Sequence, residues 1–393
     1  MEELKKVPKI RFKGFDGEWK SDLLGTHASF SKGSGYSKSD LVTVGSPIIL
    51  YGRLYTNYSV IIHKVKTFAI PKEETVYSKG NEVIVPASGE TAGDIARASA
   101  ILSEGLIIGG DLNIVYPDRF INPVFLALNI SYSNTQKLLA KKAQGKSVVH
   151  LRITDLKDTT IVYPANLSEQ TRIGTFFQSL DKLLTLHQQQ YTKLTNLKKA
   201  MLEKMFPRPG ADTPEIRFKG FEGKWEEKDV SHLCSISTGK SNTQDRNYGG
   251  YFPFYVRSAV IERSNKYLFD EEAVLTVGDG VGTGKVYHYV NGKYDLHQRV
   301  YRMFDFKNVS GLYFYYYFSI NFHKRVMAMT AKTSVDSVRL EMIAEMSILF
   351  PSLQEQHKIS TFFQNLDRMI FHHQTRLTKL RNIKKACLEK MFV

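Results

Sequence analysis

The stretch LSEQTRIGTFFQSLDKLLTLHQQQYTKLTNLKKAMLEKMF at residues 167–206 returns as LQEQHKISTFFQNLDRMIFHHQTRLTKLRNIKKACLEKMF at residues 353–392. About 24 of the 40 aligned residues are identical, so the chain is built from two copies of one plan. In each copy, apolar residues recur at steps of three and four, as in an amphipathic helix close to a heptad seam. We therefore predict two helices of about 35 residues, each roughly 50 Å long.

The partner of each helix follows from its length, because one small domain cannot bury so long a seam. We expect the two copies to pair in an intramolecular antiparallel coiled coil with a pseudo-twofold axis, with the intervening segments at opposite ends of a rod. His187 and His373 share a heptad position, where a polar seam residue that fixes register is commoner than a metal ligand or a pH switch. The predicted seam residues are Phe176, Leu180, Leu184, His187, Leu194, Met201, Phe362, Leu366, Ile370, His373, Leu380 and Cys387.

A second repeat opens each half of the chain. FKGFDGEW at residues 12–19 returns as FKGFEGKW at residues 218–225, within the pattern P-x-I-R-F-K-G-F-x-G-x-W. The blocks between these opening motifs and the long helices have little sequence in common, yet their glycine-rich stretches ASGETAGD (87–94) and GDGVGTGK (278–285) occupy similar places. We predict two variable domains at 1–166 and 214–352, a helix with its linker at 167–213, and a C-terminal helix at 353–393.

Composition limits the class of protein. The chain has 393 residues, 42% of them hydrophobic, and 54 Lys and Arg against 39 Asp and Glu give a formal charge of +15. Such a charge suits a polyanion, of which nucleic acid is the commonest. The N-terminus has no apolar signal region, no apolar run reaches 18 residues, and the two cysteines have no metal-binding spacing. We expect a cytoplasmic protein that makes no contact with a membrane and has mixed α/β (α+β) domains.

No motif in the sequence indicates catalysis. GDGVGTGKV would need Gly at Asp279 and Ser or Thr at Val286 to be a P-loop, so a glycine turn between strands is the better interpretation. NPVF (122–125) differs from the adenine-clamping loop of amino-methyltransferases at Val124. The aromatic run YFYYYF (313–318) could stack on bases, but a buried helix or strand is favoured. We predict neither a catalytic site nor a metal site in this chain.

The order of these parts resembles the specificity subunit of type I restriction-modification systems. The resemblance covers essentially the whole chain and rests on the doubled order of opening motif, variable block and helix ending in LKKAMLEKMF or IKKACLEKMF. It implies that each variable domain is a target recognition domain reading one half of a bipartite, asymmetric DNA target in the major groove. It also implies that the coiled coil sets the length of the unread spacer between the two half-sites. Two methyltransferase subunits and two restriction (motor-nuclease) subunits would be partners of the chain. S-adenosylmethionine, ATP and Mg²⁺ would belong to those partners, with no cofactor in this chain.

Base reading needs polar side chains such as Arg, Lys, Asn and Gln on loops near groove-entering elements. The basic, glycine-bearing loops SKGSGYSK (31–38) and TGKSNTQD (238–245) are candidates. Arg53 and Arg257 follow the corresponding apolar strands, and Asn113 and Gln298 fall at equivalent places near LNIVYP and HQRVYRM. Each of these could instead be an ordinary surface or turn residue. The candidates are Lys32, Ser34, Tyr36, Lys38, Arg53, Asn113, Lys240, Ser241, Asn242, Gln244, Arg257 and Gln298.

Three other functions compete with this interpretation. The chain could be a non-enzymatic coiled-coil scaffold that binds proteins, an orphan DNA-binding protein, or a nuclease or methyltransferase in its own right. A scaffold does not account for the charge of +15 together with basic glycine loops in both variable blocks. Neither a scaffold nor an enzyme explains the doubled architecture.

Overall fold

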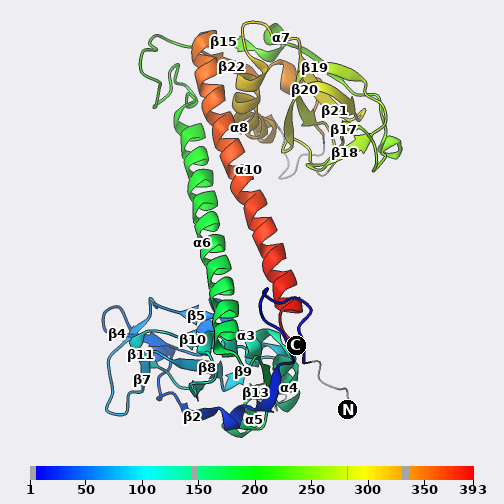
Figure 1. Cartoon of the computed structure of the whole chain (residues 1–393). Coiled ribbons are helices and arrows are strands. Elements are labelled where there is room, and N and C mark those ends of the chain that lie inside the picture. The colour runs from blue at the N-terminus through cyan, green and yellow to red at the C-terminus, as the bar shows by residue number, and fades with distance from the viewer. Residues whose placement is uncertain (1–5, 144, 146–147, 281, 330–336) are drawn as a thin grey trace. The chain divides into compact units, whose positions relative to one another are not determined.

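The computed structural model describes residues 6–143, 145, 148–280, 282–329 and 337–393. The chain divides into two compact units, one formed by residues 1–188 and 375–393 and the other by residues 189–374 (Figure 1). We call residues 20–163 of the first unit the first head and residues 226–350 of the second unit the second head. Each unit also contains parts of the two long helices α6 (Leu167–Lys204) and α10 (Leu353–Lys390).

The first head is built around a five-stranded sheet in the order β2-β12-β8-β10-β5. Every pairing in it is antiparallel except that between β10 and β5, which is parallel. The inner strands β8 and β12 are rich in Val, Ile and Leu, and all three inner strands are buried over most of their length, as expected for strands covered on both faces. The strands are β2 (Ala28–Lys32), β5 (Ile61–Ile62), β8 (Glu82–Pro86), β10 (Ser99–Ile101) and β12 (Leu112–Pro117).

A second sheet in the first head has the order β3-β6-β4-β11-β7, and two short ribbons pair β1 with β14 and β9 with β13. These strands are β1 (Lys20–Leu23), β3 (Leu41–Val42), β4 (Ser46–Ile49), β6 (Phe68–Ala69), β7 (Tyr77–Lys79), β9 (Ser88–Gly89), β11 (Glu104–Ile108), β13 (Val149–His150) and β14 (Thr160–Tyr163). The helices of this head are α1 (Arg53–Thr56), α2 (Ala92–Ile95), α3 (Pro123–Tyr132), α4 (Asn134–Lys142), α5 (Ile153–Lys157), η1 (Leu24–Thr26) and η2 (Lys38–Asp40).

The second head has one six-stranded sheet in the order β16-β21-β19-β20-β17-β18 and the ribbon β15-β22. Its strands are β15 (Glu226–Asp229), β16 (Ser235–Thr238), β17 (Phe252–Tyr255), β18 (Ile261–Ser264), β19 (Phe269–Val277), β20 (Tyr287–Leu296), β21 (Val300–Phe304) and β22 (Ser347–Phe350). Its helices are α7 (Val230–Leu233), η3 (Thr243–Asp245), α8 (Gly311–Met329) and α9 (Leu340–Ala344).

The two heads share a topology although their sequences differ. β16-β21-β19-β20 repeats the antiparallel order β2-β12-β8-β10, and the ribbon β15-β22 repeats β1-β14. A helix follows the sheet in each head, α3 in the first and α8 in the second. The predicted glycine turn of residues 278–285 connects the antiparallel strands β19 and β20, and the run 313–318 lies in the largely buried helix α8. Both predictions are confirmed.

Both long helices are 38 residues long, slightly longer than predicted. In the first unit the Asp181 carboxylate in the first half of α6 pairs with the Lys384 ammonium near the end of α10. In the second unit the order is reversed, because Lys198 near the end of α6 pairs with Asp367 in the first half of α10. These pairs join equivalent positions of the two copies, so within each unit the segments of α6 and α10 that belong to it pack antiparallel. The predicted coiled coil is confirmed.

The last aromatic residue of each repeat enters a hydrophobic core. Phe392 follows α10 and contacts Phe125 of α3 and Phe177 of α6, with ring centroids 5.8 and 6.0 Å away. Phe206 follows α6 and stacks on Phe363 of α10 at 5.8 Å. Each head is therefore completed by the end of the long helix that began in the other unit.

The opening motifs bind both long helices in their unit. Arg11 donates two hydrogen bonds to the carboxylate of Glu169 in the first turn of α6, at 2.7 and 2.8 Å. The backbone N–H of the neighbouring Ile10 donates to the carbonyl of Lys390 in the last turn of α10, at 2.9 Å. The motif thus joins the start of one long helix to the end of the other.

The second opening motif repeats these contacts in the second unit. Arg217 donates to Glu355 of α10 at 2.8 and 2.7 Å, and Ile216 donates to the carbonyl of Lys204 in α6 at 2.8 Å. A third arginine nitrogen donates to the carbonyl of Gly223, whose φ of +81° is a conformation that favours glycine. The chain contains the motif twice because each unit needs one joint between the two helices.

Candidate nucleic-acid interface

In the second head, the predicted loop 238–245 lies against the turn between β20 and β21. The backbone N–H groups of Lys240 and Ser241 both donate to the carbonyl of Leu296, at 3.2 and 3.1 Å. Gln298 donates its backbone N–H to the carbonyl of Ser241 at 2.9 Å and its side-chain amide to the Asn242 side-chain oxygen at 2.6 Å. The structure therefore brings Lys240, Asn242 and Gln298 together from distant parts of the sequence.

Arg257 lies near the same turn. Its guanidinium approaches the Asp279 carboxylate at 3.3 Å, and Arg299 approaches the other oxygen of that carboxylate at 3.6 Å. The backbone N–H of Arg299 donates to Nδ1 of His297 at 3.0 Å. Burial, followed by the charge of Arg257, lowers the pKa of His297, which favours the neutral ring that accepts this bond.

Exposure separates the second-head candidates. Lys240, Gln244, Arg257 and Gln298 are exposed, and Asn242 is half-buried. Ser241 is 1% exposed, and its hydroxyl donates to the buried carboxylate of Asp295 at 2.6 Å. This serine holds the loop on the sheet and presents no side-chain group to a ligand.

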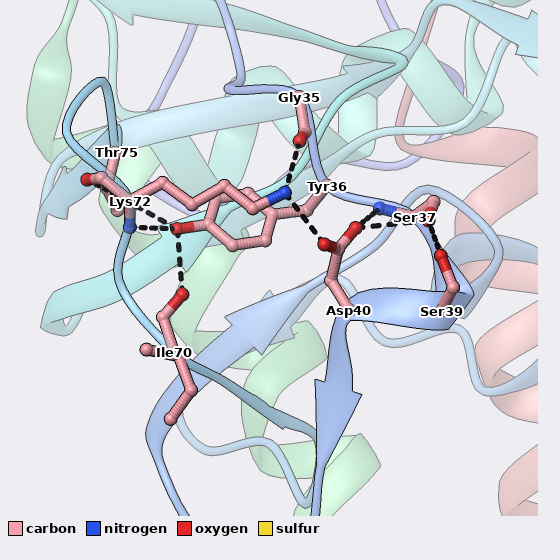
Figure 2. Close-up of polar contacts among 8 residues, drawn as sticks. All are labelled: Gly35, Tyr36, Ser37, Ser39, Asp40, Ile70, Lys72 and Thr75. Carbon is pink, nitrogen blue, oxygen red and sulfur yellow. Dashed lines mark hydrogen bonds and ion pairs between the residues drawn. The ribbon is translucent and has the colours of Figure 1, made fainter.

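In the first head, polar side chains of the loop 31–38 hydrogen-bond to neighbouring segments of the same head. Figure 2 shows the Tyr36 hydroxyl between the Ile70 carbonyl and the Thr75 hydroxyl, which lie 3.3 and 2.6 Å away. Tyr36 is 6% exposed, and the half-buried Ser34 donates to the Ile108 carbonyl at 3.3 Å. Lys32 at the end of β2 and Lys38 remain exposed.

Lys72 is a further cation of this loop region. Its ammonium donates to the Asp40 carboxylate at 2.7 Å and to the Gly35 carbonyl at 3.2 Å, and it lies 4.6 Å from the centre of the Tyr36 ring (Figure 2). The hydrogen bond from Lys72, followed by one from the Ser37 backbone, lowers the pKa of Asp40 to about 2. Lys72 lies 32 positions from Asp40, so no local motif marks it.

Two first-head candidates lie in less accessible places. Asn113 in the inner strand β12 is fully buried, and its amide donates to the Leu151 carbonyl at 2.8 Å. We therefore leave Asn113 out of the proposed surface. Arg53 begins α1 and is half-buried, and within the described part of the chain its Nε is buried without a hydrogen-bond partner. Burial lowers the pKa of Arg53.

Backbone hydrogen bonds correct two equivalences inferred from the sequence. The backbone N–H of Gly109 donates to the Ile49 carbonyl, and that of His297 donates to the Tyr255 carbonyl, so Ile49 corresponds to Tyr255. The counterpart of Arg257 is therefore Tyr51, two residues before Arg53. Gly33 donates to the Leu112 carbonyl as Gly239 donates to that of Val300. Asn113 therefore corresponds to Tyr301 and not to Gln298. The matching turns 109–111 and 297–299 have the same length, and the sequence paired the wrong residues because it does not mark where the strands begin: Asn113 lies within β12, whereas Gln298 lies in its turn.

Sequence reasoning also missed Asp279, His297 and Arg299. Arg299 directly follows the candidate Gln298, and its position in a turn between two strands could have marked it. The contact between Asp279 and Arg257 spans 22 positions and depends on the folded sheet.

The assembled surface offers hydrogen-bond donors and acceptors of the kind that read base edges and bind phosphates. Among the described residues, no group of three or more His, Cys, Asp or Glu side chains is placed to hold a metal ion. A search of the described helices for a segment long and apolar enough to cross a membrane found none. Fold and surface together define a class of protein in which two similar heads with different polar loops are completed by one duplicated helical frame.

The chain belongs to the family described as the type I restriction modification DNA specificity domain. The family model matches twice, at residues 26–196 and 222–382, once for each half. A curated relative, the type I restriction enzyme EcoDI specificity subunit of Escherichia coli, is 25% identical over 161 residues. That alignment covers 41% of this chain and 35% of the relative's length.

Two solved structures are similar to this chain, and the first of them supports the fold. The S subunit of a type I restriction-modification system from M. genitalium has a TM-score of 0.71 and 16% identity, with 98% of this chain and 99% of that chain covered. This likeness supports the fold. An HsdS subunit from Thermoanaerobacter tengcongensis has a TM-score of 0.44 and 17% identity over 95% of this chain and 96% of that chain.

Proposed function

We propose that this chain is the DNA sequence-specificity subunit of a type I restriction-modification complex. Each head reads one half of a bipartite, asymmetric double-stranded target in the major groove, and the length of the paired helices sets the unread gap. The observation that carries the proposal is one topology in two heads whose sequences and polar loops differ. Unlike loops on a common scaffold suit two unlike half-sites. The matching family model and the charge of +15 support the same function.

The partner subunits would supply the chemistry. We propose that two methyltransferase subunits bind this chain and that two restriction subunits join them, with S-adenosylmethionine, ATP and Mg²⁺ held by those partners. Repeated apolar exposure on the long helices supports two docking sites. Leu183 and its counterpart Met369 are 42% and 47% exposed, and Leu197 and its counterpart Ile383 are 38% and 37% exposed. Because the same side chains are exposed at equivalent places in both copies, a subunit that binds one copy would find a matching site on the other.

A binding experiment tests the DNA-reading part of this proposal. The full chain, alone and with its methyltransferase subunit, is incubated with a randomised duplex library, and the bound sequences are read. We expect two short conserved blocks separated by a fixed number of unread base pairs, with affinity that falls steeply as salt rises. A library without conserved blocks, or binding that is insensitive to salt, would contradict the proposal.

Single arginines test the assignment of each head to a half-site. Arg257→Ala should degrade recognition of one block and Arg53→Ala recognition of the other, as the loss of a bidentate base contact costs about 1–3 kcal/mol. Equal weakening of both blocks by either variant would indicate phosphate binding or misfolding. Circular dichroism of each variant detects misfolding directly.

A further inference from the structure

The glycine-rich segment 278–285 resembles a phosphate loop in sequence, yet in the folded chain two of its glycines, Gly280 and Gly282, lie beside Arg257. A methyl group added at Gly280, whose φ is +95°, would lie 3.7 Å from both Cβ and Cδ of Arg257. One added at Gly282 would lie 3.2 Å from the Arg257 carbonyl oxygen. The side chain of Arg257 therefore lies alongside Gly280 and its carbonyl alongside Gly282; the positive φ at Gly280 and the close approach at Gly282 favour glycine at these positions.

Asp279 lies in the same loop and is fixed through its backbone. Gly278 donates to the Arg299 carbonyl at 2.8 Å and accepts a hydrogen bond from Val338 at 2.7 Å, and Asp279 itself forms a bridge with Ser337. The loop is thus anchored to chain segments on two sides. The Asp279 side chain is 28% exposed, so its carboxylate is partly shielded from solvent.

The two arginines that meet this carboxylate are more exposed than it is. The Arg257 side chain is 47% exposed and that of Arg299 is 63% exposed, and each approaches a different oxygen of Asp279. A free arginine side chain has many rotamers, whereas one held by a carboxylate loses less freedom when it binds a ligand. Exposed ion pairs of this kind contribute little to folding stability. Fold stability therefore does not explain why an acidic group lies within a surface proposed to bind DNA.

We propose that Asp279, carried by the glycine-rich loop, is a positioning residue that holds Arg257 and Arg299 in the orientation in which they read the second half-site. The inference rests on the DNA-binding function proposed above. The inference predicts that removal of this acidic group weakens DNA binding, which is opposite to the effect expected from its charge alone. If Asp279 acted only as a charge, its removal would strengthen binding, because a negative group beside DNA repels phosphates. If it positions the arginines, its removal weakens specific binding.

The test compares the full-length wild-type chain with Asp279→Ala and Asp279→Asn, with the methyltransferase subunit present, on duplexes in which one half-site at a time is scrambled. We expect both variants to lose about tenfold or more of the discrimination between intact and scrambled second half-sites. Discrimination at the first half-site should stay at the wild-type level. Asp270→Ala is the matched control, because it removes the same charge from the opposite end of β19. It should leave both discriminations unchanged.

A second arm separates positioning from direct contact. In an Arg257→Ala, Arg299→Ala background, adding Asp279→Ala should cause no further loss at the second half-site, because the arginines through which the carboxylate acts are absent. An undiminished further loss would show that Asp279 contacts DNA itself and would overturn the inference. Unchanged or tighter specific binding by Asp279→Ala would also overturn it. If the wild-type chain shows no half-site discrimination, the proposed function fails instead.

Discussion

Single side chains join segments that are far apart in the sequence. Arg217 and Glu355 are separated by 138 positions, and their side chains are 17% and 1% exposed. Hydrogen bonds between charged groups are stronger than neutral ones, and the hydrogen bonds to Glu355, followed by its charge, raise the pKa of Arg217. No local pattern could reveal this pair, although the arginine is visible in both copies of the opening motif.

Removing the arginine should therefore be costly. We predict that Arg217→Ala lowers the free energy of unfolding of the second unit by about 3 kcal/mol, because it leaves a buried carboxylate without its partner. Urea unfolding followed by Trp225 fluorescence in a Trp19→Phe background reports on this unit, since the chain has only two tryptophans. Arg208→Ala is the control, because its 71% exposed side chain pairs with Glu215 at the surface. A loss no larger than that of the control would contradict the prediction.

Two histidines should make the second unit sensitive to acid. Burial lowers the pKa of His288 and of His297, while an unfolded histidine titrates near 6.5. Below that pH the unfolded state binds more protons, so this contribution to stability is complete above about pH 6.5 and is lost as pH falls through the folded pKa values. We expect the urea midpoint reported by Trp225 to fall between pH 7.5 and 5.5.

The same fluorescence assay supplies an internal comparison. In a Trp225→Phe background, Trp19 reports on the first unit, where the Tyr163 hydroxyl lowers the pKa of Asp22 and that group titrates only at lower pH. In the second unit, the double variant His288→Asn, His297→Asn should show a smaller difference between the urea midpoints measured at pH 7.5 and at pH 5.5. A difference that persists undiminished in this double variant would assign the acid sensitivity to other groups.

At the scale of elements, the repeated helices were predictable because their apolar spacing is regular over many turns. The strands of the heads were not, because short buried strands lack a long periodic signal. Asn113 shows the consequence: its polar side chain predicts a surface group, yet the residue is buried in the inner strand β12. The gathering of Lys240, Asn242 and Gln298 depends on loops that meet only after the sheet has formed.

The ends of the long helices should be as important to the heads as their own cores. Phe392 is 7% exposed and packs among residues of α3 and α6. We predict that Phe392→Ala lowers the stability of the first unit by about 3 kcal/mol or more, as expected for a buried phenylalanine, and leaves the second unit nearly unchanged. The tryptophan variants described above measure both. Phe371→Ala, at a 69% exposed position of α10, should affect neither unit.

At the scale of the whole molecule, duplication explains why the chain has two opening motifs, two long helices and two heads of one topology. α6 begins in the first unit and ends in the second, and α10 does the reverse, so the frame is shared by both heads. This exchange of helix ends was foreseeable from the repeat once antiparallel pairing was assumed. The proposed function adds that the frame determines the distance between two DNA half-sites.

The most direct test of that central claim removes one heptad from each long helix, within residues 180–187 and 366–373, and maps methylated sites across a genome in cells that carry the complete system. Seven residues of helix span about 10 Å, or roughly three base pairs of duplex. We predict the same two half-sites separated by a gap about three base pairs shorter. Methylation at the original spacing, with both half-sites unchanged, would contradict the claim that the helices set the gap.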